Sequence, residues 1–316
     1  MKRLAEEIIA GRRLGPQDDL DCLVSADLDD LMEGADAIRS ALCGNGADLC
    51  TIVNGRSGRC SEDCKFCAQS CLYHTGAEEY PFLPLEEIEV CAKANEAAGV
   101  HRFSIVTAGR SMAGADMEHT LAAFAHLSRT CGLKLCASLG LQRREDFERL
   151  KAAGVTRYHA NLETSRGYFP QICTTHSYED KLENICLARQ AGLEVCSGGI
   201  LGMGESWRDR MDLALELADL EITSIPLNVL HPIPGTPLET LPRLGREETL
   251  RCVALFRYIN PTAQIRMAAG RDLFPDGGAA LFRAGANAAI TGDMLTTTGT
   301  DVAADRTMLT RLGYLI

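Results

Sequence analysis

The stretch KLCASLGLQRREDFERLKAAGVTRYHANLE (134–163) carries the pattern that decides the fold. It begins with the short apolar run KLCASLG and ends with a second one, RYHANLE. A longer amphipathic segment lies between them and stops at Gly154, a residue type that commonly ends helices. Two strands joined by a helix predict a parallel pair, because parallel strands need a long crossover connection.

The same alternation runs from about residue 48 to the carboxyl end of the chain. The eight short apolar runs are LCTIVN (49–54), RFSIVTA (102–108), KLCASLG (134–140), RYHANLE (157–163), EVCSGGI (194–200), SIPLNVL (224–230), QIRMAAG (264–270) and NAAIT (287–291). Eight strands favour an α/β fold of the closed (β/α)8 TIM-barrel type over an open doubly wound sheet. Residues 1–45 have helical periodicity, so we expect an N-terminal helical extension, followed by the barrel over residues 46–316.

The composition excludes several classes of protein. A net charge of -11 over 316 residues argues against nucleic-acid or anionic-membrane binding, which need basic surfaces. The amino terminus lacks the apolar segment of a signal peptide, and no long apolar run follows, so we expect a cytoplasmic protein. Fourteen cysteines are many for such a chain. Because disulfide frameworks belong to short secreted proteins, metal ligation is the better first explanation.

Three cysteines, Cys60, Cys64 and Cys67, follow the first predicted strand directly. Their C-x3-C-x2-C spacing differs from the paired C-x2-C units of structural zinc sites, although zinc or a group of reactive thiols stays an alternative. A [4Fe–4S] cluster normally takes four cysteines, so three local ligands leave one iron open. The loop resembles that of radical S-adenosylmethionine (SAM) enzymes. In these enzymes the open iron binds SAM, and an aromatic residue, here Phe66, packs near the adenine.

A second motif, GGILGMGE (198–205), resembles the pattern that radical SAM enzymes carry at their fifth strand. The resemblance implies that Ile200 packs on the adenine. It also implies that Gly198 lets the backbone approach the nucleoside. Glycine-rich turns between a strand and a helix are common, so the motif counts because it lies in register with the cysteine triplet.

Further stretches narrow the resemblance to one family. GRCSEDCKFCAQS, RYHANLETS, ICTTHSYEDKL, EVCSGGILGMGES, SIPLNVL with PGTPL, and IRMAAGR resemble the biotin synthase family, in order, over about residues 48–300. The resemblance implies a homodimer that inserts sulfur into dethiobiotin at C9 and then C6. It implies SAM cleavage at a [4Fe–4S] cluster and a second, auxiliary iron–sulfur cluster as the sulfur donor. A flavodoxin- or ferredoxin-type electron donor is expected.

The auxiliary cluster is where this chain departs from the family pattern. The resemblance places three of its ligands at Cys136, Cys196 and Arg266, the last counted among the catalytic residues with the cysteine triplet. The family's remaining cysteine position, on the second predicted strand, is Ser104 here. A hydroxyl is a poor ligand for a soft iron–sulfur site, so one ligand of the usual set is missing.

Cys50 on the first predicted strand is the expected replacement. Alternate strands of an eight-stranded barrel contribute side chains to one layer, so Cys50 would face the other three ligands. Cys43, seven residues earlier, is a further candidate ligand. The altered set predicts an auxiliary cluster that differs from the family's [2Fe–2S] form.

The resemblance also assigns ligand contacts. Asn161 and Glu163 are expected to contact SAM, and Asn161 the substrate as well, while Asn228 is expected to hydrogen-bond the ureido ring of dethiobiotin. Rival functions on the same barrel are a hydrogenase-cofactor maturase and a methylornithine synthase. A non-catalytic iron–sulfur electron carrier belongs to a different class.

Overall fold

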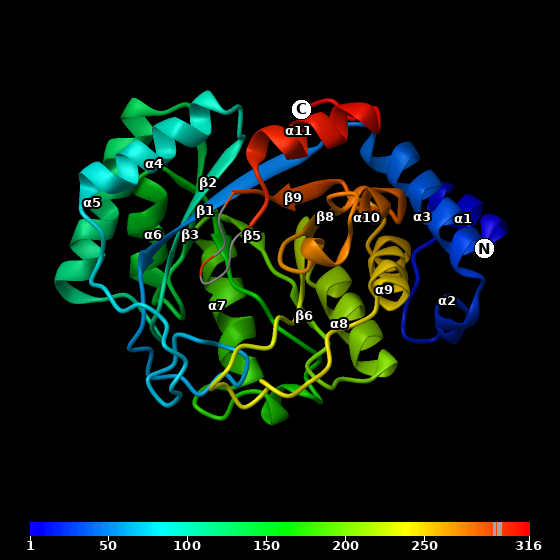
Figure 1. Ribbon diagram of the computed structural model, residues 1–316, viewed down its shortest axis with the longest axis horizontal. Coiled ribbons are helices and arrows are strands. Elements are labelled where there is room, and N and C mark those ends of the chain that lie inside the picture. The colour runs from blue at the N-terminus through cyan, green and yellow to red at the C-terminus, as the bar shows by residue number, and fades with distance from the viewer. Residues whose placement is uncertain (293–294, 296–298) are drawn as a thin grey trace.

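The computed structural model describes residues 1–292, 295 and 299–316, and Figure 1 shows a parallel sheet with helices on its outer side. Neighbouring strands pair in the order β5-β4-β3-β2-β1-β9-β8-β7-β6, and β5 also pairs with β7, which closes the ring. The strands are β1 (Asp48–Arg56), β2 (Arg102–Thr107), β3 (Lys134–Ser138), β4 (Val155–His159), β5 (Glu194–Cys196), β6 (Gly199–Leu201), β7 (Ser224–Val229), β8 (Gln264–Met267) and β9 (Ala288–Ile290).

β5 and β6 are two halves of one barrel position, interrupted at Ser197 and Gly198. The barrel therefore has eight positions, which confirms the predicted fold, and each predicted apolar run overlaps the strand at its position. The interruption brings the backbone of Gly198 against β7. A Cβ added at Gly198 would lie 1.9 Å from the carbonyl oxygen of Pro226, so only glycine fits there.

Helices cover the outer face of the barrel (Figure 1). They are α4 (Leu85–Ala97), α5 (Gly114–Thr130), α6 (Arg144–Ala152), α7 (Tyr178–Gln190), α8 (Trp207–Asp219), α9 (Arg246–Ile259), α10 (Ala279–Arg283) and α11 (Val302–Arg311), with short 3-10 turns at Phe169–Gln171 and Arg271–Leu273. α7 and α8 begin with capping boxes at Ser177 and Ser206, which satisfy the first backbone amides of each helix. Among the described residues, no helix is both long and apolar enough to cross a membrane.

Three helices precede the barrel: α1 (Lys2–Ile9), α2 (Asp21–Ser25) and α3 (Leu28–Cys43). The Asp27 side chain caps α3 by accepting hydrogen bonds from two backbone amides of its first turn. α3 packs so closely on α9 that a Cβ at Gly34 would lie 1.9 Å from the Tyr258 hydroxyl. The extension shares its core with the barrel, and the domain boundary at residue 45 stays a prediction.

Candidate functional site

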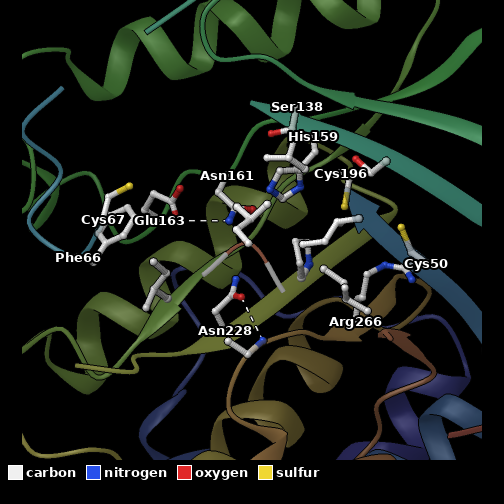
Figure 2. A pocket seen from close by; sticks show the side chains of 18 of the residues that line it. Cys50, Phe66, Cys67, Ser138, His159, Asn161, Glu163, Cys196, Asn228 and Arg266 are labelled. Carbon is white, nitrogen blue, oxygen red and sulfur yellow. Dashed lines mark hydrogen bonds between the residues drawn. The ribbon is translucent and has the colours of Figure 1, made fainter. Parts of the chain in front are cut away.

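A cavity of about 350 Å³ extends from the carboxyl ends of the barrel strands into the barrel interior. Figure 2 shows Phe66 and Cys67 at one end of it, here called the open end, and Cys50, Cys196 and Arg266 at the other, here called the closed end. The predicted site residues that line the cavity are Cys50, Phe66, Cys67, Cys136, Asn161, Glu163, Cys196, Ile200, Asn228 and Arg266.

Three buried cysteines meet at the closed end: Cys50 on β1, Cys136 on β3 and Cys196 on β5. Arg266 reaches them from β8, the seventh barrel position, and interacts electrostatically with two of them. Ser104 on β2 lies beside Cys136 in the strand register and also lines the cavity. The four side chains predicted from alternate strands therefore face one region of the barrel interior.

Three buried arginines bring positive charge to the closed end, and Asp48 and Glu194 neutralise part of it. Arg102, Arg157 and Arg266 all line the cavity, and each is less than a tenth exposed. Arg266 pairs with the Asp48 carboxylate at 3.1 Å and donates to the carbonyl oxygens of Asp48 and Ala289, both at 3.1 Å. Thiolate ligands and cluster sulfides carry negative charge, which these arginines would compensate. The closed end thus offers both soft ligands and matching charge to an iron–sulfur cluster.

The closed-end thiols differ in acidity. Burial raises the pKa of Cys50 to about 12 and also raises the pKa of Cys136. Burial acts in the same direction on Cys196, but a hydrogen bond from His159 and nearby positive charges outweigh it and lower the pKa to about 6. Metals bind the thiolate form, so Cys196 is the most readily available of the three ligands.

Cys43 does not reach the closed end. It lines a second cavity, most of whose other lining residues lie at or just before the amino-terminal ends of the barrel strands. Its thiol accepts a hydrogen bond from Nη1 of the buried Arg257 at 3.3 Å. Because α3 ends on the outside of the barrel, its last residue cannot approach the interior. The structure contradicts the expectation that Cys43 is a further cluster ligand.

The cysteine triplet lies in the connection between β1 and α4. Hydrogen bonds from the Cys67 amide to the Cys64 carbonyl at 2.9 Å and from the Cys60 amide to the Gln69 carbonyl at 3.0 Å fold this connection into a tight loop. Backbone amides also donate to the sulfurs of Cys60 and Cys67. Hydrogen bonds to sulfur are a means by which proteins tune iron–sulfur clusters, so the loop fits the predicted [4Fe–4S] site.

Asn161 and Glu163 follow β4 and line the middle of the cavity (Figure 2). The Asn161 amide nitrogen donates to Glu163 Oε2 at 3.3 Å, while its carbonyl oxygen accepts from the Gly198 amide at 3.0 Å. Glu163 has a φ of 72°, a conformation that costs energy for a residue with a side chain. Its backbone is held there by hydrogen bonds to Gly198 and Ile200. Such strain is typical of functional sites.

The GGILGMGE motif forms β6 and the turn after it. Ile200 lines the cavity, as expected for a residue that packs on a ligand. Glu205, the last residue of the motif, accepts hydrogen bonds from the amides of Gly202 and Met203 at 2.8 and 2.7 Å and pairs with Arg210 at 2.7 Å, so it fixes the turn. Contact between Gly198 and the nucleoside stays a prediction, since the close approach of β7 already requires glycine at this position.

Asn228 on β7 lines the cavity with its side-chain amide. Its two hydrogen bonds, to the Gly199 carbonyl at 3.4 Å and from the Ala269 amide at 3.3 Å, are long. Weak internal bonds leave the amide able to exchange them for bonds to a ligand. The position therefore suits a polar substrate group.

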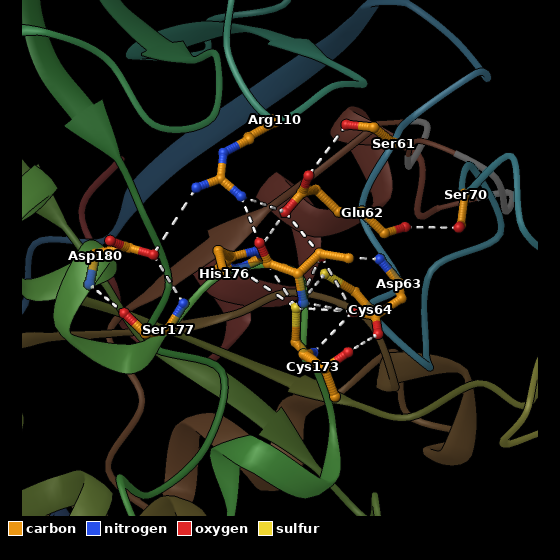
Figure 3. Close-up of polar contacts among 12 residues, drawn as sticks. Ser61, Glu62, Asp63, Cys64, Ser70, Arg110, Cys173, His176, Ser177 and Asp180 are labelled. Carbon is orange, nitrogen blue, oxygen red and sulfur yellow. Dashed lines mark hydrogen bonds and ion pairs between the residues drawn. The ribbon is translucent and has the colours of Figure 1, made fainter.

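Sequence reasoning missed two residues beside the triplet, Cys173 and His176, in the segment before α7 (Figure 3). The sulfurs of Cys64 and Cys173 lie 3.8 Å apart. The Cys64 thiol donates to Cys173, which lowers the pKa of Cys173 and raises that of Cys64. The C-x2-H spacing within ICTTH was the available signal, but its partner lies far away in the sequence.

Comparisons with known proteins agree with this geometry. Residues 56–217 match the radical SAM superfamily, and residues 226–315 match the biotin and thiamin synthesis associated domain. The chain is 56% identical to a biotin synthase from Clostridium beijerinckii, with all of both chains covered. It is 53% identical to one from Alkaliphilus metalliredigens, with 99% of both chains covered.

The chain belongs to the biotin synthase family. As a radical SAM biotin synthase it is an enzyme, a sulfurtransferase whose substrate is dethiobiotin and whose cofactors include a [4Fe–4S] cluster and SAM. The family assignment confirms the predicted function over its rivals. It leaves open the auxiliary cluster, the ligand set and the partners.

Solved structures show how widely the barrel of the biotin synthase family is shared. Methylornithine synthase superposes with a TM-score of 0.85 at 20% identity, covering 98% of this chain and 96% of that one. The FeFe-hydrogenase maturase from Carboxydothermus hydrogenoformans gives 0.80 at 16% identity, covering 99% and 79%. At these identities the likeness concerns the fold alone.

Proposed function

We propose that this biotin synthase inserts sulfur between two clusters held at opposite ends of its cavity. The observation that carries the proposal is the presence of cysteines at both ends of one cavity. Cys67 of the triplet lines the open end and three buried cysteines line the closed end, with polar side chains between them. When bound, the SAM cluster supplies the electron that cleaves SAM, and the auxiliary cluster supplies the sulfur. The chain holds both and excludes water from the space between them.

At the open end, Cys60, Cys64 and Cys67 hold the SAM cluster. Phe66 and Ile200 enclose the adenine from two sides of the cavity. The remaining contacts to SAM come from Asn161, Glu163 and Gly198, with the Glu163 carboxylate accepting hydrogen bonds from ribose hydroxyls. The strained backbone at Glu163 supports this role, because it aims the carboxylate into the cavity at an energetic cost.

At the closed end, Cys50, Cys136, Cys196 and Arg266 hold the auxiliary cluster. Cys50 takes the place of the cysteine that the family has at Ser104. The exchange moves one ligand from the second barrel strand to the first. We infer that this altered set holds a cluster larger than [2Fe–2S], and this is the part of the proposal most open to test.

Dethiobiotin occupies the middle of the cavity. Small-molecule sites are mostly apolar with a few placed polar groups, and Asn161, Glu163 and Asn228 supply such groups there. The Asn228 amide matches the ureido group with one donor and one acceptor, and Asn161 contacts the substrate from β4. Fixing the substrate between two reactive groups favours reaction over loss of the radical.

The electron donor, the oligomeric state and the location are proposed from the resemblance to the biotin synthase family. A flavodoxin- or ferredoxin-type protein delivers the electron, the enzyme is a homodimer, and it works in the cytoplasm. Sedimentation of the anaerobic holoenzyme tests the dimer, and a monomer at micromolar concentration would contradict it.

Sulfur transfer is tested with holoenzyme whose sulfide is labelled with ³⁴S, incubated anaerobically with dethiobiotin, SAM and a reductant. We expect ³⁴S-biotin in the first turnover. The C50A variant is expected to cleave SAM but to form no biotin, whereas C186S, which changes an exposed cysteine on α7, keeps both activities. Unlabelled biotin, or full biotin formation by C50A, would overturn the proposal.

A further inference from the structure

Three metal-binding side chains from separate segments converge beside the open end of the cavity. Cys64 comes from the loop after β1, and Cys173 and His176 come from the segment before α7 (Figure 3). Their ligand atoms all lie within 4.8 Å of one another. Two of the three, Cys173 and His176, have no part in the proposed sulfur-insertion site.

The distances suit one tetrahedral metal ion. Zinc–sulfur bonds of about 2.3 Å at tetrahedral angles place two sulfurs about 3.8 Å apart. The Cys64 and Cys173 sulfurs are separated by 3.8 Å. Both ring nitrogens of His176 approach the Cys173 sulfur, Nδ1 at 3.3 Å and Nε2 at 3.8 Å. The Nε2 distance is close to the separation of about 3.5 Å that a sulfur and a nitrogen ligand of one metal ion would have. A small inward movement would complete the geometry.

His176 is oriented as metal-binding histidines are. Its Nδ1 lies 2.6 Å from Oε2 of Glu62, and both side chains are buried. Glu62 is itself held by the Thr175 hydroxyl at 2.9 Å and by Arg110 at 3.4 Å. A carboxylate that accepts from one imidazole nitrogen fixes the tautomer and leaves the other nitrogen to ligate a metal.

Asp63 shapes the site without being needed as a ligand. Its Oδ1 lies 3.2 Å from the Cys173 sulfur, but it also accepts from the backbone amides of Thr174 and Thr175 at 2.8 and 3.2 Å. These bonds hold the 173–176 segment against the triplet loop. A tetrahedral ion held by the three side chains would take water at its fourth position.

We propose that Cys64, Cys173 and His176 bind a single divalent transition-metal ion, Fe²⁺ or its competitor Zn²⁺, in the chain that has not yet received its SAM cluster. Two thiolates and one imidazole are a ligand set that such borderline ions accept. Binding displaces the thiol protons to solvent. The ion and the SAM cluster exclude each other because both need Cys64. The inference rests on the proposed function only through that shared ligand.

Cobalt titration of the cluster-free full chain tests the site. The C60S/C67S background removes the other two triplet cysteines, and comparing it with the same background lacking Cys173 isolates the metal binding that needs Cys173. We expect this background to bind one more Co²⁺, with a tetrahedral thiolate spectrum, than C60S/C67S/C173S. Adding E62Q to the background should weaken that binding about 10-fold to 100-fold, as loss of a histidine-orienting carboxylate does. Equal stoichiometry with and without Cys173 would overturn the proposal.

A residue-specific measurement on the unmodified, cluster-free chain keeps the test valid if these variants fold poorly. One added equivalent of Zn²⁺ should slow alkylation of Cys173 at least tenfold, as read by peptide mass spectrometry. Cys186, exposed on α7, serves as the matched control and should react at the same rate with and without zinc. An unchanged Cys173 rate would contradict the site, and this outcome is independent of whether the holoenzyme makes biotin.

Discussion

The closed end of the cavity depends on Arg266 for stability as well as for any role toward a cluster, and R266M tests that dependence. The substitution removes a fully buried guanidinium that pairs with Asp48 at 3.1 Å and satisfies the carbonyl oxygen of Ala289. Breaking a buried ion pair by removing one partner costs about 3–5 kcal/mol. Arg102 and Arg157 also attract the Asp48 carboxylate, so this charge keeps two favourable partners in R266M. We therefore expect the free energy of unfolding to fall by about 3 kcal/mol, at the low end of that range.

The assay is urea unfolding of the cluster-free chain under reducing conditions, followed by circular dichroism. With a slope of about 3 kcal/mol per molar urea, the midpoint should fall by about 1 M. The exposed R144M on α6 is the matched control and should change the free energy of unfolding by less than about 0.5 kcal/mol. The double variant D48N/R266M should lose about 1–2 kcal/mol less than the sum of its single changes. A loss below about 1 kcal/mol in R266M would refute the reasoning.

Three further predictions follow from single contacts. G198A should destabilise the barrel by about 3 kcal/mol in urea unfolding, because its Cβ would overlap the Pro226 carbonyl, whereas G15A, with open space around it, should be neutral; equal effects would contradict the packing argument. S177A removes the α7 cap and should cost about 1 kcal/mol, lowering the melting temperature by about 2 °C; an unchanged melt would be inconsistent with the cap. N228A should raise KM for dethiobiotin about threefold to tenfold with little change in kcat; an unaltered KM in steady-state assays would remove Asn228 from the substrate site.

Much of the fold was predictable because its signals are local. Each strand is a short apolar run, and glycines mark the helix ends, so neighbouring residues carry the pattern. The sequence did not predict where the strands stop. β4 ends at His159, before the predicted 163, and the backbone then passes through the strained conformation at Glu163. That conformation is held by hydrogen bonds to β6, which are not local.

The cysteines of the closed end could be predicted from the sequence because the repeating geometry of the barrel fixes which strands share a layer. Cys50, Cys136 and Cys196 face one region since alternate barrel positions share a layer. Cys43 lies outside that repeating geometry, and its contact with Arg257 joins residues 214 positions apart. The Cys64–Cys173 pair, 109 positions apart, depends in the same way on how two loops meet, which no local pattern encodes.

The auxiliary cluster is tested most directly by Mössbauer spectroscopy of ⁵⁷Fe holoenzyme combined with iron and sulfide analysis of the same sample. We expect more than about six irons per chain, which is the sum of a [4Fe–4S] and a [2Fe–2S] cluster. We also expect an auxiliary signal that C50S loses while the SAM-cluster signal stays. A [2Fe–2S] signal that is unchanged in C50S would contradict the assignment of Cys50 and of the larger cluster.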